Sequence, residues 1–486
     1  MNERTALPFD ADKLREECGV FGVFGRQDAG ALTALGLHAL QHRGQEGGGI
    51  VSYDGEAFHS ERHAGLVGDN FTDPAVIDRL KGDRAIGHVR YATHGGIGAR
   101  NIQPLFAEFS GGGFAIAHNG NLTNATALQR QLQARGSIFQ STSDTEVFLH
   151  LIATARADRL LDRVVSALRQ VEGAYSLVCL TGKKLIGCRD PLGVRPLVLG
   201  QLDGAWILSS ETCALDIIGA THVRDVEPGE LVVITNEGLT SHKPFVPALP
   251  RFCIFEYVYF ARPDSLVEGR MVYNVRKKIG AELAREAPAE ADVVVPVPDS
   301  GVPAAIGYAE AAGLPFELGI IRNHYVGRTF IEPSDSIRHM GVKLKHNANR
   351  DILSGKRVVL VDDSIVRGTT SSKIVQMVRD AGAKEVHLRI ASPPTTDSCF
   401  YGVDTPEKSK LIGSHMSIQK MTEFIKADSL DFLSIDGLYR AVGEANREAG
   451  QPQFCDACFT GQYPTKLTDR EQAESRRSGT LIAETA

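Results

Sequence analysis

The segment VVLVDDSIVRGTT, residues 358–370, constrains the fold of this 486-residue chain more than any other. Its first four residues are β-branched or apolar, as in a buried parallel strand. Ile374, Met377 and Val378 then recur at helical spacing until Gly382 ends the pattern. The residues between them are expected to form a strand-to-helix loop, whose backbone N–H groups and helix N-terminus suit a phosphate group. The segment therefore predicts a phosphate-binding loop in a parallel α/β domain.

Asp362 and Asp363 give this loop a second function. Carboxylates do not attract an anion, so they make sense as groups that hold ribose hydroxyls or a Mg²⁺ ion carried in with a pyrophosphate. The alternative is that the two aspartates only cap the helix. The apolar run before them and the Arg-Gly-Thr-Thr after them favour the ligand site. Its other candidate substrate-binding residues are Ser364, Arg367, Gly368, Thr369 and Thr370.

This loop resembles the phosphoribosylpyrophosphate (PRPP) site of type I phosphoribosyltransferases. A second loop, VPVPDSG at 295–301, also follows a strand and precedes a helix. The resemblance implies that Ser300 binds Mg²⁺ together with the two aspartates, whereas a serine at a helix start can also be only an N-cap. The segment RNHYVGRTFI, 322–331, has few apolar anchors and is expected to close over bound PRPP. Neighbouring candidates for this site are Asp299, Arg322, Arg328, Lys343 and Lys345.

The length of the chain predicts roughly two or three domains. Short β-rich runs alternate with two helical stretches in the first half, which indicates a layered α/β domain with antiparallel strands. After a proline-rich linker the pattern becomes strand, helix, strand, with strands expected at 292–297, 316–321, 358–361 and 386–390, which indicates a doubly wound parallel sheet. The predicted divisions are a leader at 1–17, a first domain at 18–240, a linker at 241–250, a second domain at 251–440 and a polar tail at 441–486.

Composition excludes several classes of function. The net charge of −6 over the whole chain means that there is no excess of positive charge, which argues against nucleic acid as a partner. No apolar run approaches the roughly 18 to 20 residues of a spanning helix, and the N-terminus lacks the apolar core of a signal peptide. We therefore expect a cytoplasmic protein without a membrane partner. Eight cysteines in such a chain point to catalysis or metal binding rather than to disulfides.

Cys18 follows two glutamates at the head of an expected strand. A free cysteine can be simply a small buried hydrophobe. Four polar segments elsewhere in the first half favour a nucleophile instead, because together with the Cys18 segment they resemble the glutamine-hydrolysing domain of the class II amidotransferases, which are N-terminal-nucleophile hydrolases. The resemblance covers 18–240 and implies an αββα sandwich. The four segments are QHRGQEGGG (41–49), GHVRYATHG (87–95), AHNGNLTN (117–124) and STSDTE (141–146).

The resemblance also implies roles for individual residues. The leader would be removed, so that the free α-amine of Cys18 can act as the base for its own thiol. Glutamine would then be hydrolysed through a Cys18 thioester, with release of ammonia. The side chain of Asn119 and the N–H of Gly120 would form the oxyanion hole. Arg90 would bind the substrate α-carboxylate and Asp144 the α-ammonium.

A separate set of cysteines belongs to the second half. Cys455 and Cys458 form a C-x2-C pair, and Cys253 and Cys399 lie far upstream. Four thiolates suit tetrahedral zinc as well as an iron–sulfur cluster, and C-x2-C also occurs in redox sites. The surrounding sequence resembles the iron–sulfur subgroup of glutamine PRPP amidotransferases, which implies a [4Fe–4S] cluster with a structural or oxygen-sensing role. The remaining cysteines are expected to be ordinary buried thiols: Cys179, Cys188 and Cys213.

Together the two halves imply one coupled reaction. Members of this family pass ammonia from glutamine to PRPP and make 5-phosphoribosylamine, glutamate and pyrophosphate, which opens de novo purine synthesis. The resemblance further implies an enclosed passage between the sites, feedback inhibition by purine nucleotides and a homotetramer. A stand-alone amidase would not need the PRPP loop, and a PRPP-sensing regulator would need a DNA-binding segment that we do not find.

Overall fold

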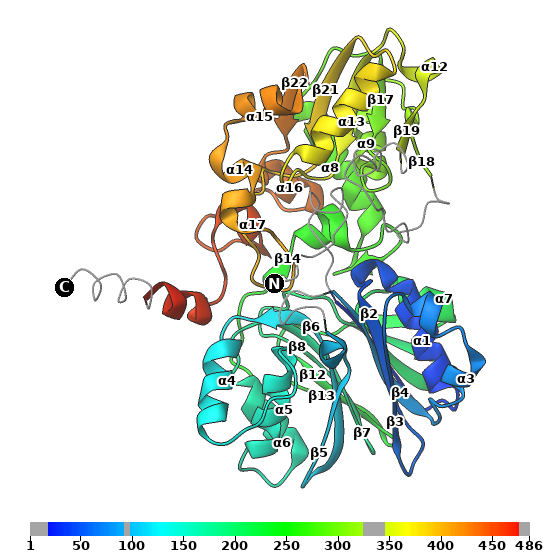
Figure 1. Cartoon of the computed structure of the whole chain (residues 1–486), viewed down its shortest axis with the longest axis vertical. Helices are drawn as coiled ribbons and strands as arrows, with labels where there is room; N and C mark the ends of the chain where they lie inside the picture. Colours follow the sequence, from blue (N-terminus) through cyan, green and yellow to red (C-terminus); the bar gives the residue numbers. More distant parts are fainter. Residues whose placement is uncertain (1–17, 92–97, 324–345, 476–486) are drawn as a thin grey trace, which may run out of the picture.

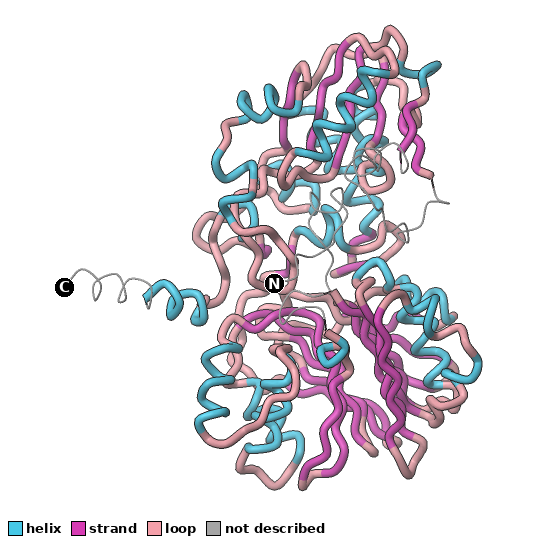
Figure 2. Tube along the Cα trace, in the orientation of Figure 1, coloured by secondary structure: helices cyan, strands magenta, loops and turns pink. Residues whose placement is uncertain are grey.

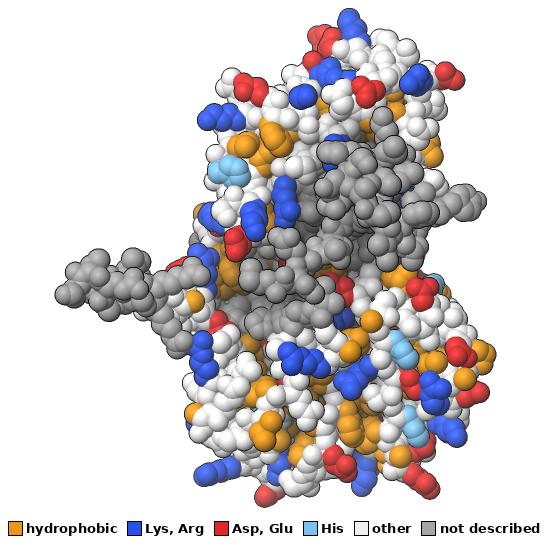
Figure 3. All heavy atoms as spheres, viewed as in Figure 1, with side chains coloured by type: hydrophobic (Ala, Val, Ile, Leu, Met, Phe, Trp, Pro, Cys, Tyr) orange, Lys and Arg blue, Asp and Glu red, His pale blue; other side chains and the backbone are white. Residues whose placement is uncertain are grey.

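The structure is a computed structural model that describes residues 18–91, 98–323 and 346–475. It consists of a β-sandwich domain and a parallel α/β domain, which lie one above the other in Figure 1. On the face shown in Figure 3, Lys and Arg side chains are interspersed with Asp and Glu over both domains. Among the described residues, no helix is both long and apolar enough to cross a membrane.

The first sheet of the sandwich has seven strands in the order β11-β9-β10-β1-β4-β2-β3, and its neighbouring strands are antiparallel. Its central strand, which follows Cys18, is buried throughout. The strands are β1 (Gly19–Phe24), β2 (Gly47–Tyr53), β3 (Phe58–Ala64), β4 (Arg84–Arg90), β9 (Val198–Leu202), β10 (Ala205–Ser209) and β11 (Thr221–Asp225).

The second sheet has six antiparallel strands in the order β13-β12-β8-β7-β6-β5. Its longest strand carries the predicted oxyanion residues and pairs with β7 along its whole second half. The strands are β5 (Leu105–Phe109), β6 (Gly112–Leu122), β7 (Gly173–Thr181), β8 (Leu185–Arg189), β12 (Leu231–Thr235) and β13 (Gly238–His242).

Alternation along the strands explains why the two sheets stack. Val20 and Ile86 of the first sheet pack with Ala115 and Val178 of the second in one buried cluster, whereas Phe21 points the other way, toward the helices. Helices therefore cover both outer faces, as Figure 2 shows, and the predicted αββα sandwich is confirmed. They are α1 (Ala29–Ala39), α2 (Val67–Asn70), α3 (Pro74–Ile77) and α7 (Cys213–Ile218) on one side, and α4 (Ala125–Ala134), α5 (Thr145–Thr154) and α6 (Leu160–Leu168) on the other.

The second domain is built on a four-stranded parallel sheet in the order β17-β20-β21-β22. Alternate residues of β20 face opposite layers, because Val359 and Val361 pack with one helical layer and Val358 and Leu360 with the other. The predicted parallel sheet is confirmed. Its elements are β17 (Val293–Pro296), β20 (Arg357–Asp362), β21 (Glu385–Ile390) and β22 (Ser429–Phe432), with α8 (Val272–Glu286), α9 (Val302–Ala312) and α16 (Ile435–Val442) on one face and α13 (Thr369–Asp380) and α15 (Ile418–Ile425) on the other.

One expected strand is different. The sequence predicts a strand at 316–321, but Phe316 makes only a single bridge to Val294. The N–H of Gly319 then donates to the carbonyl of Glu317 at 2.9 Å, and this tight turn takes the chain out of the sheet. A separate antiparallel pair follows, formed by β18 (Ile320–Arg322) and β19 (His346–Ala348).

The tail, for which the sequence predicts no periodic element, contributes to both domains. Its strand β23 (Phe454–Cys455) pairs in parallel with β14 (Phe252–Cys253), followed by the short helix α17 (Ala457–Thr460). Residues 468–475 are helical. The carboxylate of Asp469 accepts hydrogen bonds from the N–H groups of Thr126 and Ala127 at 2.7 and 2.9 Å and so caps α4 of the sandwich. The tail therefore ties the two domains together.

Candidate active sites

Cys18 lies at the end of the sandwich, where β1 begins. Its thiol is only 7% exposed and donates to the carbonyl of Tyr91 at 3.5 Å. Burial raises the pKa of this thiol to about 11, although the nearby charge of Arg90 works in the opposite direction. The thiol is therefore protonated near neutral pH and needs a base to become a nucleophile. The predicted leader, residues 1–17, lies outside the described residues.

The second sheet brings the predicted oxyanion donors. Asn119 is completely buried, and within the described structure neither polar atom of its side-chain amide has a hydrogen-bond partner. Leaving such a group unpaired costs roughly 1–3 kcal/mol, so an unpaired amide in a folded core indicates a functional constraint. Gly120 follows with a φ of 142°, and a Cβ at this position would lie 2.1 Å from the carbonyl oxygen of Ala174. Only glycine fits there.

Charged side chains of both signs surround the thiol. Arg90, Asp144 and Glu46 all interact electrostatically with Cys18. Asp144 is held by the N–H of Leu122, which donates to its carboxylate at 2.9 Å. The buried cation of Arg90 beside the buried carboxylate of Asp144 suits a zwitterionic ligand such as an amino acid. The structure thus brings the predicted pair together, and it adds Glu46, for which the glycine-rich run after it was the only sequence signal.

A buried ion cluster that the sequence did not reveal joins this site to the second domain. Arg43, from the short 3₁₀-helix η2 (Gln41–Arg43), bonds to Glu211 and, at 2.6 Å, to Glu256. Arg195 lies 3.5 Å from Glu256. All four side chains are at most 1% exposed. Glu256 opens the π-helix η4 (Glu256–Phe260), so the cluster fixes an element of the second domain against the sandwich.

The predicted PRPP loops meet at the carboxyl ends of β17 and β20. The hydroxyl of Ser300 donates to Asp363 at 2.5 Å, and the hydroxyl of Ser364 donates to the other oxygen of Asp363 at 2.7 Å. Asp362 accepts from the N–H of Asp363 at 2.9 Å. Both aspartates are 2% exposed. The sequence did not reveal Arg276, a buried side chain from α8 that interacts electrostatically with Asp363.

The helix end of the loop has the geometry expected for an anion site. Gly368 takes a left-handed conformation, with φ 76°, immediately before α13, so Thr369 and Thr370 occupy its first turn. Arg367 precedes this glycine in the same loop. Oxygen ligands from Ser300 and the two aspartates suit Mg²⁺, a hard cation that prefers carboxylates and hydroxyls.

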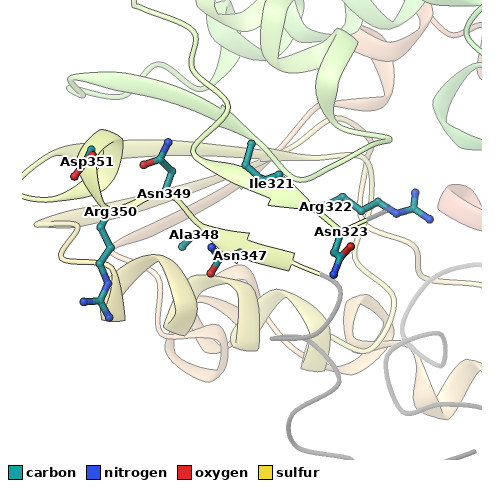
Figure 4. A pocket seen from close by; sticks show the side chains of 8 residues that line it. All are labelled: Ile321, Arg322, Asn323, Asn347, Ala348, Asn349, Arg350 and Asp351. Atoms are coloured by element: carbon teal, nitrogen blue, oxygen red, sulfur yellow. The ribbon is translucent and has the colours of Figure 1, made fainter. Parts of the chain in front are cut away.

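A pocket lined by β18, β19 and residues 349–351 lies beside this site, with Arg322 and Arg350 at its opposite ends (Figure 4). Arg322 also pairs with Asp299 of the 295–301 loop. Of the predicted closing segment at 322–331, only the first two residues are described. Arg328, Lys343 and Lys345 lie outside the described residues.

The four cysteines of the second half surround one cavity. Cys253 and Cys455 lie opposite each other in the β14–β23 pair, and Cys399 and Cys458 complete the wall. All four are free thiols. Four thiols around a single apolar cavity fit a thiolate-bound metal group, although no three Cys, His, Asp or Glu side chains in the described ranges converge on a position for one metal ion. The other predicted buried thiols are confirmed as buried: Cys179, Cys188 and Cys213.

Comparisons with known proteins agree with this geometry. Residues 88–216 match the family model described as a glutamine amidotransferase domain, and residues 264–394 match that of a phosphoribosyl transferase domain. The chain is 61% identical over 469 residues to an amidophosphoribosyltransferase of Rhizobium etli, which covers 95% of both proteins. It is 52% identical to the chloroplastic amidophosphoribosyltransferase 1 of Arabidopsis thaliana, over 95% of this chain and 81% of the relative.

A solved structure is also similar over nearly the full length. The glutamine PRPP amidotransferase of Bacillus subtilis, complexed with ADP and GMP, superposes with a TM-score of 0.88 at 49% identity and covers 93% of this chain and 98% of its own. Fold and sites thus define a class II glutamine amidotransferase joined to a phosphoribosyltransferase. At this identity and coverage, the chain belongs to the amidophosphoribosyltransferase family. It hydrolyses glutamine and transfers the ammonia to PRPP, giving 5-phosphoribosylamine, glutamate and pyrophosphate in the first committed step of de novo purine synthesis.

Proposed function

We propose that glutamine hydrolysis is carried out by Cys18 as the first residue of a processed chain. Its α-amine takes the thiol proton, and the thiolate attacks the side-chain amide carbon of glutamine. Asn119 Nδ2 and the N–H of Gly120 stabilise the oxyanion, ammonia leaves, and water then releases glutamate from the thioester. Arg90 binds the α-carboxylate and Asp144 the α-ammonium. The observation that carries this assignment is the buried Asn119 amide, which has no hydrogen-bond partner in the described ranges of the chain.

In the second site, we propose that the loop from Ser364 to Thr370, with Arg367 and Gly368, holds the pyrophosphate and ribose of PRPP. Ser300, Asp362 and Asp363 would hold Mg²⁺, which neutralises diphosphate charge when it is bound. Ammonia attacks the anomeric carbon as pyrophosphate departs. The hydrogen bond from the Ser300 hydroxyl to the Asp363 carboxylate supports the assignment, because it joins the two loops through groups that could share a cation.

We also propose that Cys253, Cys399, Cys455 and Cys458 bind a [4Fe–4S] cluster rather than zinc. Their shared cavity and free thiols support a metal group, and its place at the β14–β23 pair means that it would fasten the tail. The proposed reaction requires no electron transfer, so the role of the cluster is structural or oxygen-sensing.

Regulation and assembly are proposed from the relatives. Because the Bacillus subtilis relative is complexed with ADP and GMP, and another similar structure is described as the allosteric regulatory enzyme of purine biosynthesis, we propose purine nucleotides as feedback inhibitors. We further propose a cytoplasmic homotetramer without nucleic-acid or membrane partners.

Native mass spectrometry of anaerobically purified enzyme tests these assignments together. The expected result is a chain that begins at Cys18, with four iron atoms per subunit and four subunits. A mature active enzyme that begins at Met1 or Asn2 would exclude the self-base mechanism. One zinc and no iron would exclude the cluster. Cys455→Ser should lower iron content and stability, whereas Cys179→Ala, a buried thiol outside the cavity, should leave iron content unchanged.

A further inference from the structure

A loop of the transferase domain, residues 399–403, packs directly against the strand that carries the oxyanion residues. Gly402 has a φ of 115°, and a Cβ on it would lie 3.1–3.3 Å from three backbone atoms of Gly120. Next to this contact, Asn121 Nδ2 donates to the carbonyl of Phe400 at 3.0 Å. The loop therefore contacts two consecutive residues of β6.

The same loop also reaches the neighbouring strand through Arg195. The Nε of Arg195 donates to the carbonyl of Tyr401 at 2.8 Å, and the carbonyl of Arg195 accepts from the hydroxyl of Ser176 at 3.1 Å. Ser176 lies opposite Asn119 in the β6–β7 pairing. The transferase loop thus contacts Gly120 directly and is linked to Asn119 through two residues, Arg195 and Ser176.

The contacts with this loop matter because the interactions of Gly120 and Asn119 themselves do not set the orientation of their N–H donors. Glycine has wide conformational freedom, so the direction of the Gly120 N–H is not set by its own φ preferences. The Asn119 amide has no hydrogen bond in the described structure that would orient it. On one side Gly120 is confined by the carbonyl of Ala174, and on the other it faces Gly402.

We propose that Gly402 and Asn121 are positioning residues for glutamine hydrolysis, which hold the Gly120 peptide so that its N–H points at the developing oxyanion. The inference rests on the proposed roles of Cys18, Asn119 and Gly120. Oxyanion stabilisation depends on donors fixed to within a few tenths of an ångström before the reaction. The transferase domain would thereby complete the glutaminase site of its own chain.

Gly402→Ala is the principal test. The added methyl group meets the Gly120 backbone, and alanine is strained at this φ. We expect the kcat for glutamine hydrolysis to fall by about ten- to a hundredfold, in the range of losing part of one oxyanion donor. The KM for glutamine should change less than about threefold, because its charged groups are bound by other residues. Synthesis from PRPP and free ammonia should be unchanged.

Two further variants provide a matched control and a second change at the same contact. Gly443→Ala is the matched control, because Gly443 also has a positive φ, of 99°, but has no atom within 4 Å of an added Cβ. It should keep both activities. Asn121→Leu removes the donor to Phe400, together with a longer bond of 3.3 Å to the carbonyl of Leu122, and should lower the glutaminase kcat by about fivefold or more. Hydrogen exchange along β6 should become faster in Gly402→Ala and Asn121→Leu and remain unchanged in Gly443→Ala.

The outcomes separate this inference from the proposed function. Folded Gly402→Ala and Asn121→Leu enzymes with normal glutaminase kcat would overturn the positioning role, and so would an equal loss of ammonia-dependent synthesis. A Cys18→Ala enzyme measured in the same series that still hydrolyses glutamine would instead overturn the assignment on which the inference rests.

Discussion

The two active sites of this chain hold their polar groups in opposite ways. In the glutaminase site the oxyanion residues sit on a strand of the sandwich, and Asn119 is buried with no hydrogen-bond partner among the described residues. In the transferase site the polar groups sit on loops at the carboxyl ends of parallel strands, and Ser300, Ser364 and Asp363 already bond to one another.

The difference reflects when the charge arrives. Glutamine is hydrolysed through an oxyanion that exists only during the reaction. Its hydrogen-bond donors must therefore be preorganised and unpaired before the oxyanion forms. PRPP brings its own charge and cation, and the transferase groups can satisfy one another until these arrive. Changes to the oxyanion donors of the first site should therefore act on rate, and changes to the carboxylates of the second site on both binding and rate.

Replacement of Cys18 should give the largest effect and should separate the two sites. Cys18→Ala removes the thiol, so no thioester can form. Glutamine-dependent synthesis should fall by several orders of magnitude, whereas synthesis from free ammonia should persist and rise with pH as more ammonia becomes unprotonated. Both rates can be measured in one coupled assay.

The control for this variant concerns maturation, because Cys18→Ala can block removal of the leader. The variant should be expressed with the initiator methionine directly before the substituted residue, so that no leader remains to be removed. A folded enzyme that loses both activities equally would show that the sites cannot be separated.

The converse experiment is the double change of Asp362→Asn and Asp363→Asn. Loss of both carboxylates should abolish synthesis from either nitrogen source, because neither ribose nor Mg²⁺ is held. Basal glutamine hydrolysis should remain. Asp380→Asn, an exposed aspartate at the end of α13, is the control and should be neutral. Normal synthesis in the double mutant would mean that the two aspartates only cap the helix.

Much of this architecture could be predicted from local patterns. β20 and α13 follow directly from a β-branched run and a helical repeat. Among the strands that were not predicted, β3 has no fully buried residue and β13 lies at a sheet edge, whereas β8 and β12 are buried and were also missed. Edge strands bury too little apolar surface to leave a periodic signal.

The candidate sites were predicted as sets of residues, but not as contacts. Cys18, Asp362 and the cavity cysteines stand in distinctive sequence segments. In contrast, the Arg43–Glu256 pair joins residues 213 positions apart, and the Asn121–Phe400 bond joins residues 279 apart. Such contacts depend on how the two domains pack, and nothing in the local sequence encodes them.

A smaller effect is expected from Asn119→Ala. Loss of one oxyanion donor should lower the glutaminase kcat by about a hundredfold. Stability should not fall, because the amide has no hydrogen bond among the described residues that the substitution would break. Asn124→Ala is the contrasting variant: this buried amide bonds to Gln170 and Glu172, so its loss should cost roughly 1–3 kcal/mol of stability while kcat stays near normal. Equal destabilisation by both variants would contradict the assignment of the Asn119 amide as an oxyanion donor that is unpaired before the reaction.

The smallest effect concerns the pH dependence of the stability of the sandwich domain. His88 on β4 is fully buried beside the carbonyl of His118, and burial lowers the pKa of His88 to about 3. In the unfolded chain a histidine has a pKa near 6.5, so below that pH the unfolded state binds more protons and stability falls as the pH falls. Between pH 7 and pH 5 this one group should remove about 2 kcal/mol.

Urea unfolding of the wild type and of His88→Gln at pH 7 and pH 5 measures this contribution. Glutamine cannot titrate, so the variant should lose about 2 kcal/mol less than the wild type between the two pH values, whatever its stability at pH 7. An equal loss of unfolding free energy in the wild type and in His88→Gln between pH 7 and pH 5 would show that the folded sandwich does not keep this imidazole neutral. The interior would then be more accessible to water than the unpaired Asn119 amide implies.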